Sequence, residues 1–218
     1  MTDRQIIFSA PMVRALLDGR KSQTRRLIKD RGARPEFCGG RYDDRNDPSN
    51  WGWEDTERGE WITLDKFRTY RFVPYAPGDR LYVRETVTRQ ETDQGVGFQT
   101  YAADGSQVWP LTQWYHKRNV IPSIHMPRWA SRLTLTVTDV RVQRLQEISE
   151  ADAVAEGCAE GHVVDDISGV HEGWSARTDF RTLWNSLHGP GAWDANPWIV
   201  AISFTVQHGN IDRIGGAA

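Results

Sequence analysis

The pattern of apolar and polar residues at the start of the chain predicts a short strand followed by a short helix. Residues 5–8, QIIF, form an apolar run of strand length. Apolar side chains then recur at helical spacing over residues 12–17. Ser9 stands where a helix N-cap is expected, Pro11 suits the first turn, and Gly19 is a typical stop signal.

Three later segments have the alternation or the apolar content of strands. In RLYVRETV, the side chains of Leu81, Val83 and Glu85 point to one face. A carboxylate on an apolar face needs either a partner or a function. Residues 132–145 alternate apolar side chains with threonine and give the strongest strand pattern. PWIVAISFTV, residues 197–206, predicts a last strand.

Two further helices are expected in the C-terminal third. Ser149 can cap a short helix that ends at Gly157, with Asp152 as a partner of capping-box type. The segment FRTLWNSLHG is amphipathic. Its predicted apolar face holds Phe180, Leu183, Trp184 and Leu187.

Two long stretches show neither pattern. Residues at about 30–73 begin rich in Gly, Asp, Asn and Pro, and a second irregular stretch covers about 89–122, so both are interpreted as surface insertions. Residues 209–218 are expected to form a mobile tail. The strands and helices are scattered among one another, which predicts a single α+β domain over residues 1–208, built around a small, partly closed sheet.

The composition is that of an ordinary globular protein. The 218 residues are 39% hydrophobic and 26% charged, which allows a sizeable core. No apolar run has the length of a membrane span or a signal peptide. Cys38 and Cys158 have no metal-type spacing, so we expect free thiols in a reducing cytoplasm. A pI near 6.3 argues against a protein that binds nucleic acid over its whole surface, and leaves a local basic groove open.

Positive charge is concentrated near the N-terminus. Between Arg14 and Arg34 there are eight Lys or Arg and two Asp, although the whole chain has a net charge of −2. Such a local field suits a nucleic-acid patch, a phosphate site or a tuned catalytic lysine. Residues 149–166 hold six acidic and no basic side chains, and are the natural electrostatic counterpart.

Lys21 and Thr24 are the strongest candidates for chemistry in this basic segment. A lysine acts as a general base only if its pKa lies well below about 10.4. The neighbouring Arg20, Arg25 and Arg26 would lower it by disfavouring a further positive charge. Thr24 would then be the nucleophile. The simpler alternative is a solvated basic edge just past a helix end, where the helix dipole favours cations.

Other residue types give weaker signals. The six histidines form no HxH or HxxxH pair, and no GxSxG, Walker A or GxGxxG motif occurs. Aromatic rings can stack on nucleobases, and ten tryptophans are unusual. Trp51, Trp53 and Trp129 are the better stacking candidates, with packing in a loop as the alternative, whereas Trp184 and Trp198 have positions typical of a core.

Four sequence blocks, in this order and spacing, resemble the ASCH family: GRKSQTRR, PGDRLYVRE, LTVTDVRVQRLQEISEADAVAEG and NPWIVAISF. The resemblance covers nearly the whole chain. It implies a PUA-like small β-barrel with flanking helices, a fold related to RNA-binding domains, here with two large loop insertions. The longer format, with PMVRALLDGRKSQTRR and PSIHMPRWASR, is similar to members common in phages and prophages.

The resemblance also implies positions for catalytic residues. One small bacterial member of the family removes the acetyl group from N4-acetylcytidine with a lysine, a threonine and a glutamate. The family motif GRKTxTxR places the lysine at Lys21, the threonine at Thr24 and the last arginine at Arg26. The family pattern TExxAxxE corresponds to SEADAVAE and places the glutamate at Glu156. Ser22 stands where the family has threonine and is the rival nucleophile.

The implied function is that of a metal-independent amidohydrolase, without a cofactor, that removes acyl groups from N4-acylated cytosine nucleosides. Its catalytic residues would be Lys21, Thr24 and Glu156. Substrate binding is expected from Arg26, Glu85 and Trp129. We expect a monomer that acts on a small nucleoside, with RNA as a second candidate substrate. The alternative function is a non-catalytic RNA- or nucleotide-binding module, and a ribonuclease is a weaker one.

Overall fold

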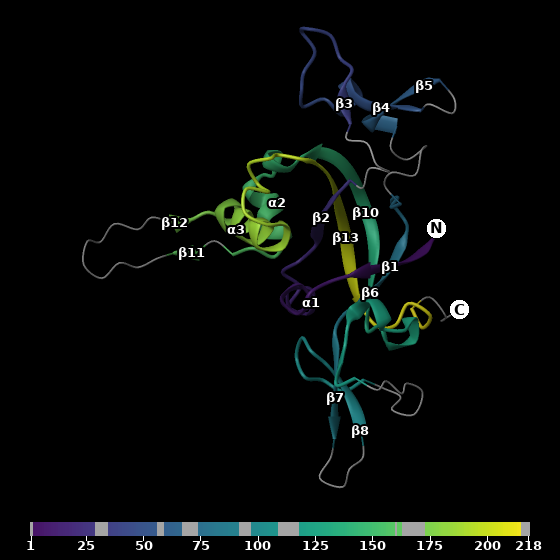
Figure 1. The fold of residues 1–218 in the computed structure, drawn as a ribbon. Coiled ribbons are helices and arrows are strands. Elements are labelled where there is room, and N and C mark those ends of the chain that lie inside the picture. The colour runs from purple at the N-terminus through teal and green to yellow at the C-terminus, as the bar shows by residue number, and fades with distance from the viewer. Residues whose placement is uncertain are drawn as a thin grey trace, which may run out of the picture. The chain divides into compact units, whose positions relative to one another are not determined.

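A computed structural model shows a mixed α+β chain that is rich in strands and has few helices (Figure 1). It describes residues 2–28, 35–55, 59–66, 74–91, 97–108, 118–159, 161–162 and 173–214. Contacts divide the chain into two compact units, each made of separate stretches of sequence. The first unit comprises Met1–Ser22, Pro77–Thr138 and Phe204–Ala218. The second comprises Gln23–Ala76 and Asp139–Ser203.

The first unit holds the N-terminal elements and the second predicted insertion. Its helices and strands are β1 (Asp3–Ile7), α1 (Ala10–Leu17), β6 (Arg80–Arg84), β7 (Val87–Glu91), β8 (Gly97–Tyr101), β9 (Val120–Ile121), η3 (Ser123–His125) and η4 (Arg128–Ala130). Strand β1 pairs in parallel with β6, so that Ile6 lies beside Val83. Helix α1 ends as predicted, because Gly19 adopts a φ of 71°. Ser9 occupies the N-cap position but makes no side-chain capping hydrogen bond.

The second unit holds the remaining helices and the first predicted insertion. Its elements are β2 (Gln23–Leu27), β3 (Glu36–Phe37), η1 (Pro48–Asn50), β4 (Trp51–Asp55), β5 (Glu60–Thr63), η2 (Leu64–Lys66), η5 (Leu145–Glu147), α2 (Glu150–Ala155), β11 (Gly161–His162), β12 (Gly173–Trp174) and α3 (Ala176–His188). Ser149 caps α2 as predicted, with its hydroxyl accepting from the Asp152 N–H at 3.1 Å. The apolar face of α3 buries Phe180 and Trp184, but Leu187 is 51% exposed, against the prediction.

Two long neighbouring strands run through both units (Figure 1). They are β10 (Leu133–Arg144) and β13 (Trp198–His208), and both confirm the strands predicted from alternation and apolar content. The strand order of the largest sheet is β1-β6-β10-β13-β2. Among the described residues this order ends at β1 on one side and at β2 on the other. The mixture of helices and strands confirms the α+β class, and the closed barrel stays a prediction.

The two predicted insertions contain small sheets of their own, where irregular loops were expected. Strands β3, β4 and β5 form one three-stranded sheet, and β8, β7 and β9 form another. The first packs Trp53 and Leu64 against Trp198 of β13. The second packs Val87 and Tyr101 into a cluster with residues that follow β9. Tertiary packing therefore makes strands in segments whose composition is typical of loops.

The C-terminal segment, predicted to be a mobile tail, packs against the rest of the first unit over its described part, residues 210–214. The Asn210 amide donates to the carbonyls of Arg128, Trp129 and Ser131 at 2.8–3.1 Å. Ile211 is only 1% exposed. Residues 215–218 lie outside the described part of the chain. Within that described part, no helix combines the length and the apolar character needed to cross a membrane.

Candidate active site

The segment that begins at Lys21 is buried, which contradicts the alternative of a solvated basic edge. The exposed fractions are 1% for Lys21, 4% for Gln23, 2% for Thr24 and 5% for Arg25. Ser22, the rival nucleophile, is exposed. Burial of polar side chains costs free energy unless they find partners, so this segment requires a polar environment built by the rest of the fold.

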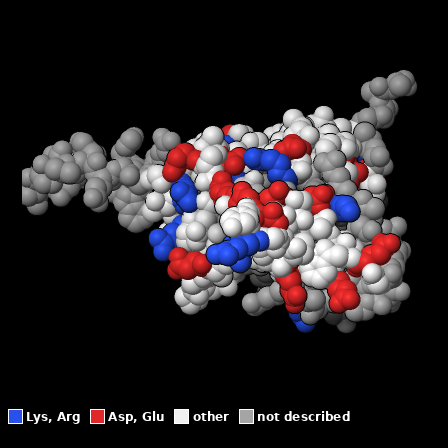
Figure 2. Space-filling model, turned by 90° about the horizontal axis from the view of Figure 1, so that it is seen from above, with Lys and Arg blue, Asp and Glu red and all other residues white. Residues whose placement is uncertain are grey.

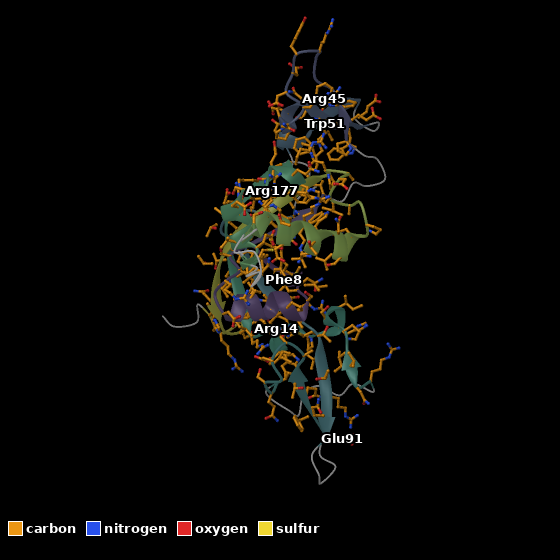
Figure 3. The ribbon with its side chains drawn as sticks, turned by 90° about the vertical axis from the view of Figure 1, so that its left-hand side faces the viewer. Phe8, Arg14, Arg45, Trp51, Glu91 and Arg177 are labelled. Atoms are coloured by element: carbon orange, nitrogen blue, oxygen red, sulfur yellow. The ribbon has the colours of Figure 1, made fainter. Side chains whose placement is uncertain are left out.

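Lys21 belongs to the first unit, where the end of α1 positions it. Its backbone N–H donates to the carbonyl of Ala15 at 3.0 Å, which fixes the chain directly after the helix. The ammonium nitrogen of Lys21 lies 5.7 Å from the centroid of the ring of Phe8, which is labelled in Figure 3. The Phe8 ring in turn packs at 6.5 Å from Phe204 of β13. The Lys21 ammonium therefore lies beside the Phe8 ring, within the range of a cation–π contact, which favours the charged form and opposes the neutral amine that a general base needs.

In the second unit, the pairing of β2 with β13 divides the motif between two faces of the sheet. Arg25 lies opposite Ala201, which belongs to the core covered by α3, so Gln23 and Arg25 face α2 and α3. Thr24 lies opposite Ile202, so Thr24 and Arg26 share the other face. Thr24 and Arg26 are therefore neighbours on one face of the sheet.

The acidic helix supplies the partners of Arg25, as the charge pattern predicted. Arg25 Nη1 donates to the side-chain oxygen of Gln23 and to Glu156 Oε1, the latter at 3.4 Å. Nη2 lies 3.0 Å from Asp152 Oδ2, at an angle that does not make a hydrogen bond. Gln23 Nε2 completes the network by donating to Asp152 Oδ1 at 3.1 Å. Asp152 and Glu156 are four residues apart on α2 and its C-cap, which places both on one side of that helix.

Burial and charge act in opposite directions on these groups. Burial lowers the pKa of Arg25, and the carboxylates of Glu156 and Asp152 oppose this effect. Burial also lowers the pKa of Arg26, opposed by Tyr75 and Glu156. Burial alone would raise the pKa of Asp152, but hydrogen bonds from Arg141 and Gln23, with the charge of Arg25, lower it below its usual value.

The positive field expected around Lys21 is smaller than the run of cations suggests. Arg20 is exposed and pairs with Asp18 at 2.8 Å, and Arg25 is matched by two carboxylates. Figure 2 likewise shows acidic and basic side chains interspersed on the face it presents, without one broad field of a single sign. This weakens the case for a large nucleic-acid surface on that face.

Glu85 is paired, which is one of the two explanations offered for a carboxylate on an apolar face. It is 1% exposed, and its two oxygens accept from Arg132 Nε at 2.8 Å and from Arg132 Nη2 at 3.0 Å. Arg132 also donates to Asp104 at 2.7 Å and stacks on the Tyr101 ring at 3.9 Å. Burial raises the pKa of Glu85 even with Arg132 beside it. These contacts link the β7–β8 hairpin to the start of β10 and support a structural role for Glu85 over substrate binding.

We expect Glu85→Gln to destabilise the protein by about 1–3 kcal/mol, because the amide keeps one acceptor for Arg132 but loses the charge-assisted pair. Urea unfolding of the two proteins at neutral pH measures the difference. Glu91→Gln, on the exposed end of the same hairpin, is the matched control and should change stability by less than about 0.5 kcal/mol. Equal midpoints for Glu85→Gln and wild type would contradict the structural role.

Asp104 should make the free energy of unfolding depend measurably on pH in the acidic range. Burial alone would raise the pKa of Asp104, but hydrogen bonds from Arg132 and Ser106 lower it to about 2. The folded state thus holds fewer protons than the unfolded state, so this stabilisation is present above about pH 4 and is lost as the pH falls toward 2. We expect Asp104→Asn to cost about 1 kcal/mol at pH 6, after allowance for solvent screening, and almost nothing near pH 2. A stability difference that is independent of pH would refute this assignment.

The tryptophans expected to stack on bases are engaged within the protein. Trp53 is 8% exposed, and Trp51 donates its indole N–H to the Arg45 carbonyl at 2.8 Å (Figure 3). The Arg144 guanidinium covers Trp51 at 4.2 Å and Trp198 at 4.4 Å. Trp129 is partly buried and packs against the core cluster that holds Val87 and Tyr101. The packing alternative therefore accounts for Trp51, Trp53 and Trp129.

Three residues that matter to these networks were not singled out as site residues from the sequence: Gln23, Asp152 and Arg132. Gln23 and Asp152 became visible only through the contact between β2 and α2, 129 residues apart in the chain. Arg132 had one available signal, since a buried Glu85 requires a cation. Within the described residues, no group of three or more His, Cys, Asp or Glu side chains could hold a metal ion.

Thr24, Arg25 and Arg26 all lie on β2, but Arg25, which pairs with Glu156, is on the sheet face opposite to that of Thr24 and Arg26. Lys21 lies in the first unit and Thr24 and Glu156 lie in the second, so the convergence of all three stays a prediction. Comparisons of the chain with protein-family models, with curated proteins and with solved structures found no match. The function of the chain is therefore inferred from the residues of the motif and from their burial.

Proposed function

We propose that the chain is an amidohydrolase of the ASCH type, with a PUA-like fold, that removes acyl groups from N4-acylated cytosine nucleosides. The observation that carries the proposal is the burial of Lys21, Thr24 and Glu156, at 1%, 2% and 5% exposure. Ionisable and hydroxyl side chains are rarely buried without a role, and a water-poor site strengthens their interactions. The motif resemblance supplies the chemistry for the same three residues.

In the proposed reaction the Thr24 hydroxyl attacks the acyl carbonyl, and Lys21, as a neutral amine, takes the hydroxyl proton. The resulting ammonium returns the proton to the N4 nitrogen as the C–N bond breaks, which releases the cytosine amine. Water then hydrolyses the acyl ester of Thr24 and restores the free hydroxyl. Arg26, on the same sheet face as Thr24, is the candidate for stabilising the oxyanion. A variant of this scheme has Thr24 orienting the attacking water.

The direct test is the change in ultraviolet absorbance when N4-acetylcytidine is converted to cytidine and acetate. A series of N4-acyl chain lengths should be offered to protein whose folding has been checked by circular dichroism. Turnover of at least one member is expected. Absence of turnover over the whole series, together with salt-sensitive micromolar binding of RNA, would reject the amidohydrolase and favour the alternative of a non-catalytic RNA-binding module.

A further inference from the structure

Burial of the charged network around Arg25 costs free energy that a protein could avoid with an apolar core. The Arg25 side chain has an exposed fraction of 0%, and burial lowers its pKa. Its Nε has no hydrogen-bond partner among the residues that the structure describes. Replacing a buried ion pair by apolar side chains of similar volume is often neutral or stabilising. The presence of a charged network at this buried position therefore suggests a role other than packing.

The network also lies outside the residues that the family motifs specify. Gln23 and Arg25 occupy the two variable positions of GRKTxTxR, and Asp152 occupies a variable position of TExxAxxE. All three side chains are nevertheless joined to one another, and Arg25 contacts Glu156. These three residues, which the family motifs do not specify, form a hydrogen-bonded and ion-paired network next to the Glu156 carboxylate.

The geometry points to Arg25, braced by Gln23 and Asp152, as a positioning residue that orients the Glu156 carboxylate. The planar guanidinium holds its donors in a fixed fork. Nη2 lies 3.0 Å from Asp152, and Nη1, which donates to Glu156, also donates to the side chain of Gln23, so the guanidinium has little freedom to rotate. The kinetic part of this inference rests on the proposed function, whereas the orientation of the carboxylate does not.

The kinetic test compares Arg25→Met with Arg141→Met. Arg141 pairs with the same Asp152 at 3.0 Å from a position that is 44% exposed, so its loss perturbs the network from the outside. We expect kcat of Arg25→Met to fall about 10- to 100-fold with little change in KM, because a misplaced catalytic group costs rate more than binding. Arg141→Met should stay within about twofold of wild type. A kcat for Arg25→Met equal to that of Arg141→Met would overturn the proposal.

Two further variants keep the proposal testable if Arg25→Met folds poorly. Arg25→Met/Asp152→Asn also removes the charge of one of the two carboxylates that Arg25 balances, and it should regain stability without regaining kcat. Arg25→Lys keeps the charge but lacks the fork, so it should also remain slow. Recovery of full kcat in either variant would show that Arg25 acts only through folding.

A measurement without substrate separates this inference from the proposed function. In protein with ¹³C-labelled glutamate, the infrared difference spectrum between wild type and Glu156→Gln isolates the carboxylate stretch of Glu156. We expect this band to shift in Arg25→Met and to stay in place in Arg141→Met. An unshifted band in Arg25→Met overturns the positioning role. A shifted band in a protein that hydrolyses no N4-acylcytidine would retain the positioning role and reject the proposed function.

Discussion

Lys21→Arg should lose about 10²- to 10⁴-fold in kcat/KM toward an N4-acylcytidine, as large a loss as Lys21→Met. In the proposed reaction, Lys21 must give up and regain a proton. A guanidinium keeps the positive charge but is not deprotonated in a protein. If the lysine served only to stabilise an oxyanion by its charge, arginine would restore much of the activity. The comparison of the two variants therefore distinguishes a general base from an electrostatic role.

The folding of the lysine variants has to be checked, because Lys21 is buried beside Phe8. Arginine is longer than lysine, whereas methionine has a similar volume and no charge. Near-ultraviolet circular dichroism and urea midpoints should be measured for Lys21→Met and Lys21→Arg together. A folded Lys21→Arg with most of the wild-type activity would show that Lys21 is not the base.

Thr24→Val should abolish hydrolysis, with a fall in kcat of about 10³-fold or more if the hydroxyl is the nucleophile. Valine is nearly isosteric with threonine and suits a strand, so the buried position on β2 should still be filled. Thr24→Ser should keep partial activity, because it retains a hydroxyl at the same position. If Thr24 only orients water, the loss in Thr24→Val should be smaller and no acyl-enzyme should be trapped by rapid acid quench and mass spectrometry.

A matched control for Thr24→Val is Thr134→Val, at a second fully buried threonine. Thr134 donates its hydroxyl to the Gly209 carbonyl at 3.0 Å and lies on β10 in the first unit. This change should cost about 1 kcal/mol of stability and leave kcat unchanged. Ser22→Ala, at the exposed rival nucleophile, should also stay active. Activity in Thr24→Val together with its loss in Ser22→Ala would reverse the assignment.

Regular elements were predictable where local signals agreed. The stop at Gly19, the cap at Ser149 and the alternation in β10 all come from neighbouring residues, and the structure has all three. The strands of the insertions were missed because they depend on distant packing, such as Trp53 and Leu64 on Trp198. Leu187 shows the reverse error, because helical spacing alone does not tell where an apolar face ends.

The sequence predicted which residue types make up the candidate site, but it did not predict that these residues are buried. The charge pattern indicated that the basic and acidic segments would meet, and Arg25 with Asp152 and Glu156 confirms it. Burial of the same strand was not foreseen, because a run of cations is normally solvated. That burial arises from the pairing of β2 with β13 and from the contacts with α2, which join residues more than 120 positions apart.

The pairing of β2 with β13 also sets the moment at which the candidate site forms during synthesis. Thr24 lies opposite Ile202, and Gln23 opposite Ser203, so β2 can pair only after a strand about 180 positions later in the chain has been translated. At about 5–20 residues per second, that delay is roughly 10–40 s. Until then Gln23, Thr24 and Arg25 lack the strand opposite which they lie in the folded protein. A polypeptide released before Trp198 would contain every residue of the Lys21, Thr24 and Glu156 set and still lack the strand against which β2 is built.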